Sequence, residues 1–127
     1  MQHRITPERI DRLEPGQIFV FGSNIAGHHG GGAAYTALVK FGAEYGQGDG
    51  LQGQSYAISS MEGLDNMAIH VRDFIAFARQ HKEMTFLVTR IGCGIAGYTV
   101  QEVAPLFADA VELDNVWLPL DFWNIII

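Results

Sequence analysis

The fold of this chain is decided by the stretch Ile18-Phe19-Val20-Phe21-Gly22-Ser23-Asn24-Ile25-Ala26-Gly27-His28-His29-Gly30-Gly31-Gly32-Ala33-Ala34. Its leading apolar residues have no polar face and predict a short buried strand. The chain then breaks at Gly22 and runs through a glycine-rich loop to the small residues that open a helix. This combination can hold a phosphate, because backbone N–H groups approach an anion without obstruction and a helix start carries partial positive charge.

A second glycine-rich loop follows an apolar run at residues 85–89, which predicts another strand, and has the sequence Gly92-Cys93-Gly94-Ile95-Ala96-Gly97. A short glycine-rich turn is a weak signal by itself. Two of them in the same strand–loop context indicate one shared ligand with negative charge. We therefore expect residues 27–32 and 92–97 to lie close together in the folded chain.

The rest of the chain alternates between helical and strand patterns. Thr6-Pro7-Glu8 has the order of a helix start, so a short helix is expected before residue 14. Thr99 and Glu102 have the spacing of a capping box, and Pro105 is expected to kink the helix that they open. The other expected elements are strands at 18–21, 55–59 and 115–119, helices near 34–41 and at 67–81 with Asp65 as N-cap, and a long flexible loop at 42–53.

This alternation predicts an α/β fold, a three-layer sandwich with a mainly parallel sheet and helices on both faces. In such sheets ligands collect at the carboxyl ends of the strands, where both glycine-rich loops fall. A length of 127 residues fits a single domain over residues 1–127. The tail from Leu120 ends in three isoleucines, so we expect it to form a further strand or a buried contact in a homo-oligomer.

The composition is that of a globular chain with an acidic balance. Apolar residues make up 48% and charged residues 17%, and the formal net charge is −6. That charge argues against duplex nucleic acid as a partner, although backbone amides can still bind a small anion. One cysteine excludes an intramolecular disulfide. The sequence shows no apolar run of about 18 residues and no signal-peptide pattern, so no membrane partner and a cytoplasmic location are expected.

Several polar residues in the loops have more than one interpretation. Asn24 offers a donor and an acceptor to ribose hydroxyls, or its side chain caps a turn. His28 and His29 could orient a water or donate to a phosphate, or they are a solvated pair; without a nearby acid they predict no metal site. Cys93 could act as a nucleophile, or its small size suits a place between two glycines. Arg90 pairs with a phosphate or with a nearby carboxylate.

The two loops resemble those of a known family, the macrodomains. Their first loop is similar to Asn24…Gly30-Gly31-Gly32-Ala33-Ala34, and their second is similar to Ile91-Gly92-Cys93-Gly94-Ile95-Ala96-Gly97-Tyr98. The resemblance implies a macrodomain-like fold that binds ADP-ribose or a related nucleotide diphosphate, with Asn24 by the distal ribose and no cofactor. The ligand-binding residues expected on this basis are Gly22, Ser23, Asn24, Gly30, Gly31, Gly32, Ala33, Gly92, Cys93, Gly94, Ile95, Ala96, Gly97 and Tyr98.

Three hypotheses for function follow. The first is a binding module for ADP-ribose or a similar nucleotide diphosphate, which backbone N–H groups of the two loops would hold. The second is a hydrolase that removes ADP-ribose from a modified substrate, with the substrate's phosphate and Asn24 positioning the water and with His28 or His29 as candidates for an acid–base group. The third is a non-catalytic interaction protein on the same scaffold, which would dimerise through its apolar tail.

Overall fold

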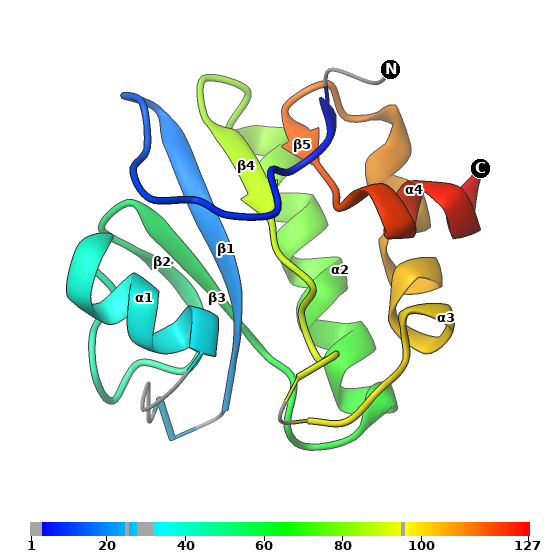
Figure 1. The fold of residues 1–127 in the computed structure, drawn as a ribbon, viewed down its shortest axis with the longest axis horizontal. Helices are drawn as coiled ribbons and strands as arrows, with labels where there is room; N and C mark the ends of the chain where they lie inside the picture. The colour runs from blue at the N-terminus through cyan, green and yellow to red at the C-terminus, as the bar shows by residue number, and fades with distance from the viewer. Residues whose placement is uncertain (1–3, 25, 28–31, 95) are drawn as a thin grey trace.

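The computed structural model describes residues 4–24, 26–27, 32–94 and 96–127, which form an α/β fold on a five-stranded sheet (Figure 1). The strands are β1 (Gln17–Ser23), β2 (Gly50–Gln52), β3 (Ser55–Ser59), β4 (Thr85–Val88) and β5 (Val116–Trp117), in the order β2-β3-β1-β4-β5. β1 pairs in parallel with β3 and β4, and β5 pairs in parallel with β4. The edge strand β2 is antiparallel to β3. The prediction of a mainly parallel sheet is confirmed.

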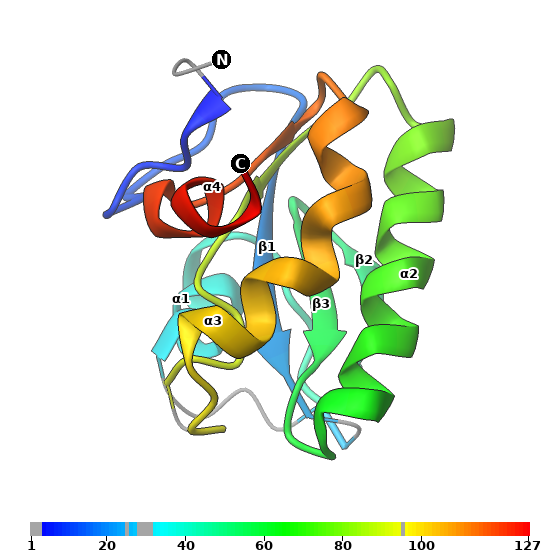
Figure 2. The same cartoon turned by 90° about the vertical axis from the view of Figure 1, so that its right-hand side faces the viewer.

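Helices pack on both faces of this sheet (Figure 2). They are α1 (Gly32–Lys40), α2 (Leu64–Gln80), α3 (Val100–Val103), α4 (Leu120–Ile126) and the 3-10 helix η2 (Ala104–Glu112). Because side chains alternate along a strand, Phe19 and Phe21 of β1 point to α1 and pack with Ala37. Ile18 and Val20 point the other way, into a larger core with α2, η2 and α4. In the part of the chain that the structure describes, every helix is too short or too polar to cross a membrane.

Helix α2 buries the face that its sequence pattern predicts. Its buried side chains are Met67, Val71, Phe74, Ile75 and Ala78. The predicted N-terminus is wrong, because the Met67 N–H donates to the Gly63 carbonyl at 2.9 Å and the helix therefore begins at Leu64. Asp65 lies in the first turn instead of at the cap, where its charge suits the positive end of the helix.

The helix predicted from Thr6-Pro7-Glu8 is wrong. Ile5 forms a parallel bridge with Leu118, and the Thr6 N–H donates to the Leu118 carbonyl at 2.9 Å. The Leu118 N–H donates in turn to the Arg4 carbonyl at 3.2 Å. Pairing with the end of β5 therefore extends the backbone where the local signal favours a helical turn. Among the described residues, the backbone of residues 7–13 makes no hydrogen bond to other backbone groups.

Arg4 is a buried cation that ties this N-terminal segment to the other end of the chain; it is 7% exposed. Its guanidinium donates to four carbonyl oxygens at the end of η2 and the start of β5, those of Ala110, Val111, Leu113 and Val116. The Arg4 carbonyl accepts from Trp123 Nε1 at 3.0 Å, and the guanidinium lies over the Trp123 ring. Burial lowers the pKa of Arg4, and the carbonyl oxygens stabilise its charge.

The loop predicted at residues 42–53 contains the edge strand β2 and is held by side-chain hydrogen bonds. Gln52, 2% exposed, donates to the Gln47 carbonyl at 2.9 Å. Asp49 accepts from both the backbone N–H and the hydroxyl of Ser59, at 2.9 and 2.8 Å. Such contacts leave no periodic pattern in the sequence, which explains why this strand escaped prediction.

The predicted capping box is present. The Thr99 hydroxyl accepts from the Glu102 N–H, and the Glu102 carboxylate accepts from the Thr99 N–H. Helix α3 gives way at Ala104 to η2, near whose start Pro105 lies. This change agrees with the expected break in the helix, because proline removes a backbone donor.

The C-terminal tail forms a helix, so the prediction of a further strand is wrong. The N–H groups of Phe122 and Trp123 both donate to the Pro119 carbonyl, which ends the extended segment and starts α4. The two aromatic side chains are buried in the larger core. Ile127 remains 72% exposed, and the predicted contact with a second copy stays a prediction.

We expect Arg4→Met to lower the free energy of unfolding by about 3 kcal/mol or more, because several buried carbonyl oxygens lose their donor at once. Arg9→Met is the matched control, since Arg9 is exposed and pairs with the exposed Asp11. For this control we expect a change within about 0.5 kcal/mol. Urea unfolding followed by circular dichroism measures both values, and equal losses in the two variants would contradict the structural role of Arg4.

Candidate functional site

The two glycine-rich loops meet at one cavity of about 250 Å³. The first loop connects β1 to α1, and the second connects β4 to α3. The described residues that line the cavity are Gly22, Ser23, Asn24, Gly32, Ala33, Ala34, Ser60, Met61, Thr89, Arg90, Ile91, Gly92, Gly94 and Ala96. The structure therefore brings together two segments that are far apart in the sequence, as expected from their patterns.

The cavity lies at the carboxyl ends of three neighbouring parallel strands, β3, β1 and β4. Ser23 at the end of β1 lies opposite Ser59 in register, and the Ser60 N–H donates to the Ser23 carbonyl at 2.9 Å. On the other side of β1, Thr89 donates to the Val20 carbonyl through its N–H and its hydroxyl, at 3.1 and 2.8 Å. These bonds extend the sheet slightly past its strands, so both loops start from fixed positions.

The first loop turns sharply after Asn24. The Gly27 N–H donates to the Asn24 carbonyl at 2.9 Å, and the Gly46 N–H donates to the Gly27 carbonyl at 2.8 Å. Gly27 has a φ of 72°, and a Cβ there would lie 2.3 Å from the Gln47 nitrogen. Only glycine fits this approach, so the segment 42–53 supports the first loop from behind.

The second loop contains two glycines with different structural requirements. Gly92 has a φ of 79°, and a Cβ there would lie 3.2 Å from the Tyr98 ring and 3.3 Å from Met67 Cε. Gly94 has no positive φ, and a Cβ there would have nothing within 4 Å. The fold therefore requires glycine at position 92 but tolerates a side chain at position 94. Because Gly94 lines the cavity, its missing side chain leaves open space at the wall.

The described wall of the cavity has no acidic residue, although the net charge of the chain is −6. None of the described lining residues is acidic, and among them Arg90 alone carries a formal charge. The first residues of α1 also line the cavity, and α1 has no acidic residue in its first turn. The first N–H groups of a helix have no partner within it and carry partial positive charge. This wall is suited to an anion.

Most of the predicted ligand-binding residues that the structure describes line this cavity. They are Gly22, Ser23, Asn24, Gly32, Ala33, Gly92, Gly94 and Ala96. Among the described positions, Cys93, Gly97 and Tyr98 do not line it. The predicted residues His28, His29, Gly30, Gly31 and Ile95 lie outside the described residues.

Cys93 and Tyr98 pack inward, where both are partly buried against the larger core. The Cys93 thiol donates to the Ile91 carbonyl at 3.7 Å, and burial raises the pKa of this thiol. A raised pKa keeps the sulfur protonated, and the thiolate is the nucleophilic form. The structure therefore favours the interpretation of Cys93 as a small buried residue over that of a nucleophile.

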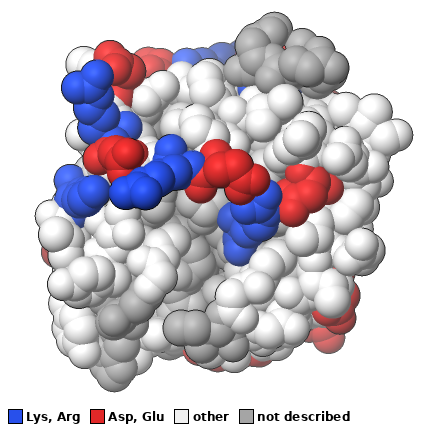
Figure 3. Space-filling model, viewed as in Figure 1, with Lys and Arg blue, Asp and Glu red and all other residues white. Residues whose placement is uncertain are grey.

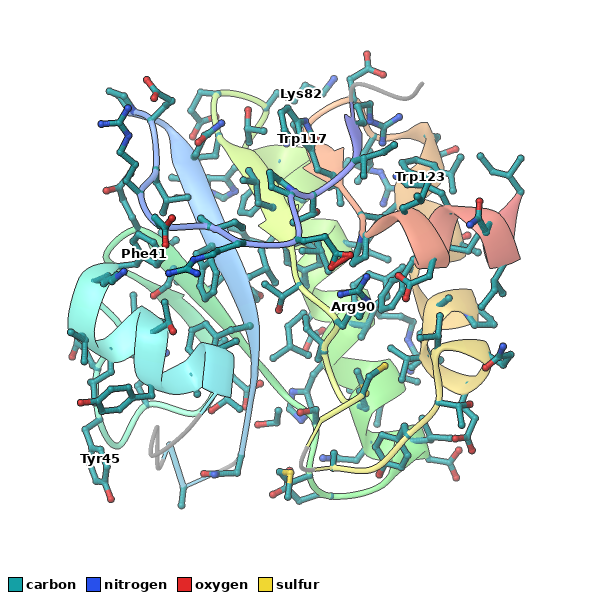
Figure 4. All side chains as sticks on the ribbon, in the orientation of Figure 1. Phe41, Tyr45, Lys82, Arg90, Trp117 and Trp123 are labelled. Atoms are coloured by element: carbon teal, nitrogen blue, oxygen red, sulfur yellow. The ribbon has the colours of Figure 1, made fainter. Side chains whose placement is uncertain are left out.

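Sequence reasoning missed lining residues that directly follow two strands. Ser60 and Met61 follow β3, and Thr89 and Ile91 follow β4. Their position was a usable signal, because ligands of parallel sheets lie at the carboxyl ends of the strands. Arg90 pairs with carboxylates in the structure, which is one of the two interpretations that its sequence position left open (Figure 4).

A second cavity of about 600 Å³ adjoins the first. It lies between the N-terminal segment 5–11 and α1, over Phe19 of β1. Ala33, Thr89 and Arg90 line both cavities, so the two form one groove on this face of the sheet.

Comparison with protein-family models, with curated proteins and with solved structures finds no match for this chain. The class of protein is therefore defined by the fold and the site themselves. It is an α/β protein with an anion-suited cavity at the carboxyl edge of a mainly parallel sheet.

We expect Gly92→Ala to lower the free energy of unfolding by about 1–3 kcal/mol, because an alanine at a φ of 79° is strained and its methyl group presses on Met67 and Tyr98. Gly94→Ala is the matched control two residues away. There we expect no loss, and a gain of up to about 1 kcal/mol from a less flexible unfolded chain. Urea unfolding distinguishes the two, and an equal loss in both would contradict the described geometry of this loop.

Proposed function

We propose that this chain binds ADP-ribose or a related nucleotide diphosphate, with the diphosphate in the smaller cavity. The observation that carries the proposal is the meeting of the two glycine-rich loops around a cavity whose described wall has no carboxylate. Backbone N–H groups and the N-terminus of α1 would supply most of the binding. The position of the cavity supports the proposal, since ligands of parallel sheets lie at this edge.

The size of the groove supports a ligand with more than one part. The smaller cavity, about 250 Å³, suits a diphosphate and an adjacent sugar, and the adjoining 600 Å³ leaves room for the remainder of a nucleotide. Asn24 is half-buried at the wall of the smaller cavity. In this proposal its side-chain amide bonds the hydroxyl groups of a ribose.

We further propose that the fold is a short macrodomain-like three-layer sandwich. Support comes from the resemblance of the two loops and from the order of the elements around them. Each loop follows a parallel strand and leads into a helix, and helices lie on both faces of the sheet.

The described residues support binding in preference to hydrolysis. The described wall offers hydroxyl, amide and guanidinium groups, but none of its described residues carries a carboxylate or an imidazole, the usual general bases. His28 and His29, the predicted acid–base candidates, lie outside the described residues. Turnover of an ADP-ribosylated protein that is lost in His28→Ala or His29→Ala would replace this proposal with the hydrolase.

We expect isothermal titration calorimetry to detect binding of ADP-ribose to the wild-type chain and to show about tenfold weaker binding for Gly94→Ala, equivalent to about 1.4 kcal/mol. The added methyl group would project into space that the fold leaves open. Because Gly94→Ala is not expected to lower stability, its loss of affinity reports on the ligand alone. Unchanged affinity, or no binding of ADP-ribose by the wild-type chain, would overturn the proposal.

We expect Asn24→Ala to weaken the binding of ADP-ribose by about fivefold, equivalent to the loss of a hydrogen bond of about 1 kcal/mol. Asn124→Ala is the matched control, since Asn124 is exposed on α4 and does not line either cavity. The same titration measures both variants. Equal affinities in the two variants would remove Asn24 from the site and leave the loops as the remaining support.

A further inference from the structure

Arg90 lies where the two cavities join, and all three of its guanidinium nitrogens contact carboxylates. Nη1 and Nη2 donate to the two carboxylate oxygens of Glu8 at 2.8 and 2.9 Å. Nε donates to Asp121 Oδ2 at 2.8 Å. The end of the guanidinium that carries Nη1 and Nη2, which can pair bidentately with a carboxylate or a phosphate, is therefore occupied by Glu8.

The two carboxylates that hold Arg90 belong to elements with different backbone hydrogen bonding. Asp121 belongs to α4, whose aromatic residues are buried in the core. Glu8 belongs to the segment 7–13, whose backbone makes no hydrogen bond to other backbone groups among the described residues. The Glu8 side chain is 76% exposed. Asp121 therefore orients the guanidinium, whereas Glu8 can leave it without disrupting a helix or strand.

Arg90 lies on a face of the molecule that carries several charged side chains. Figure 3 shows a band of alternating basic and acidic side chains across this face. Among the described residues, ion pairs join Arg90 to Glu8 and Asp121, and Arg9 to Asp11. Arg90 alone among the charged residues of this band also lines the smaller cavity. The hydrogen bonds from Arg90 lower the pKa of Glu8. The Glu8 carboxylate is therefore ionised at neutral pH, where it competes with other anions for Arg90.

We propose that Glu8 is an internal competitor that occupies Arg90 until a phosphate group of the ligand takes its place. This inference rests on the proposed function, because it assigns Arg90 to the phosphate of the same ligand. A phosphate offers the same pair of oxygens to the guanidinium as the Glu8 carboxylate does. The exchange leaves neither charge without a partner, since the Glu8 carboxylate becomes hydrated and Arg90 keeps an anionic partner.

Release of Glu8 would also change the shape of the groove. The segment that carries Glu8 forms one wall of the larger cavity, together with Thr6, Pro7 and Ile10. Thr6 is 6% exposed, and its buried hydroxyl oxygen Oγ1 has no hydrogen-bond partner among the described residues. A buried hydroxyl without a partner is costly. Thr6, which lines the larger cavity two residues before Glu8, therefore contributes a buried hydroxyl without a described partner to this wall.

The test compares Glu8→Gln with Glu112→Gln in titrations with ADP-ribose. Both substitutions remove one negative charge from an exposed pair with arginine, because Glu112 pairs with Arg79 at 2.9 Å and does not line either cavity. We expect Glu8→Gln to bind ADP-ribose about five- to tenfold more tightly, the factor for a competing contact that is occupied about 80–90% of the time. Glu112→Gln should change the affinity less than about twofold, since long-range effects of one surface charge are screened by salt.

A second comparison places the effect at Arg90. In the Arg90→Gln background, Glu8→Gln should give no gain, because the contact for which Glu8 and the ligand compete is absent. Arg90→Lys keeps the charge but loses the bidentate face, so it should lose most of the gain. Urea unfolding of each variant confirms that the folded state is retained before affinities are compared.

The outcomes separate this inference from the proposed function. Binding by the wild-type chain with no gain in Glu8→Gln would overturn the inference alone and make Glu8 a simple brace. Equal gains in Glu8→Gln and Glu112→Gln, or a gain that persists without Arg90, would also overturn it, because net charge would then explain the effect. Binding of ADP-ribose by none of the variants would overturn both proposals.

Discussion

The parallel pairing of β1 with β3 and β4 is the constraint on which the rest of the structure depends. β1 is the central strand, and its residues Val20 and Phe21 are fully buried on opposite faces. Because the three strands run in one direction, their carboxyl ends lie at the same edge of the sheet. The loops that follow them must then meet, although about 60 residues of sequence separate the two that are rich in glycine. The cavity is a direct consequence of this pairing.

The residues that line the smaller cavity differ in charge from the chain as a whole. The chain is acidic overall, yet the described wall of the smaller cavity consists of glycine, alanine, hydroxyl and amide side chains, the apolar Met61 and Ile91, and one arginine. Several carboxylates are engaged elsewhere, for example Asp49 with Ser59 and Glu112 with Arg79. A net charge is a property of the whole surface, whereas an anion responds to the groups within a few ångströms. The acidic composition and an anion-suited cavity are therefore compatible.

Arg4 and Arg90 differ in burial and in the groups to which they donate. Arg4 is buried under Trp123 and donates to backbone carbonyls, which cannot move away without unfolding the end of η2. Arg90 is partly exposed and donates to carboxylates, one of which belongs to a segment without backbone pairing. A buried hydrogen-bonded cation is costly to disrupt, whereas an exposed ion pair exchanges readily with other anions. Arg4 therefore stabilises the fold, whereas the pair of Arg90 with Glu8 can exchange for another anion, as our proposal requires.

Local sequence determined the elements whose patterns are self-contained. The apolar run at 18–21, the buried face of α2 with Met67 and Phe74, and the capping box at Thr99 are all as predicted, because periodicity and capping act over a few residues. Tertiary structure alone decided that Thr6-Pro7-Glu8 is not a helix, because Ile5 pairs with Leu118 across almost the whole chain. It likewise decided where the helical tail packs, with Trp123 against Arg4, and the meeting of Arg90 with Glu8, since both depend on partners distant in sequence. Sequence by itself thus specified the two glycine-rich loops, and only the parallel sheet, by aligning the ends of its strands, made them one site.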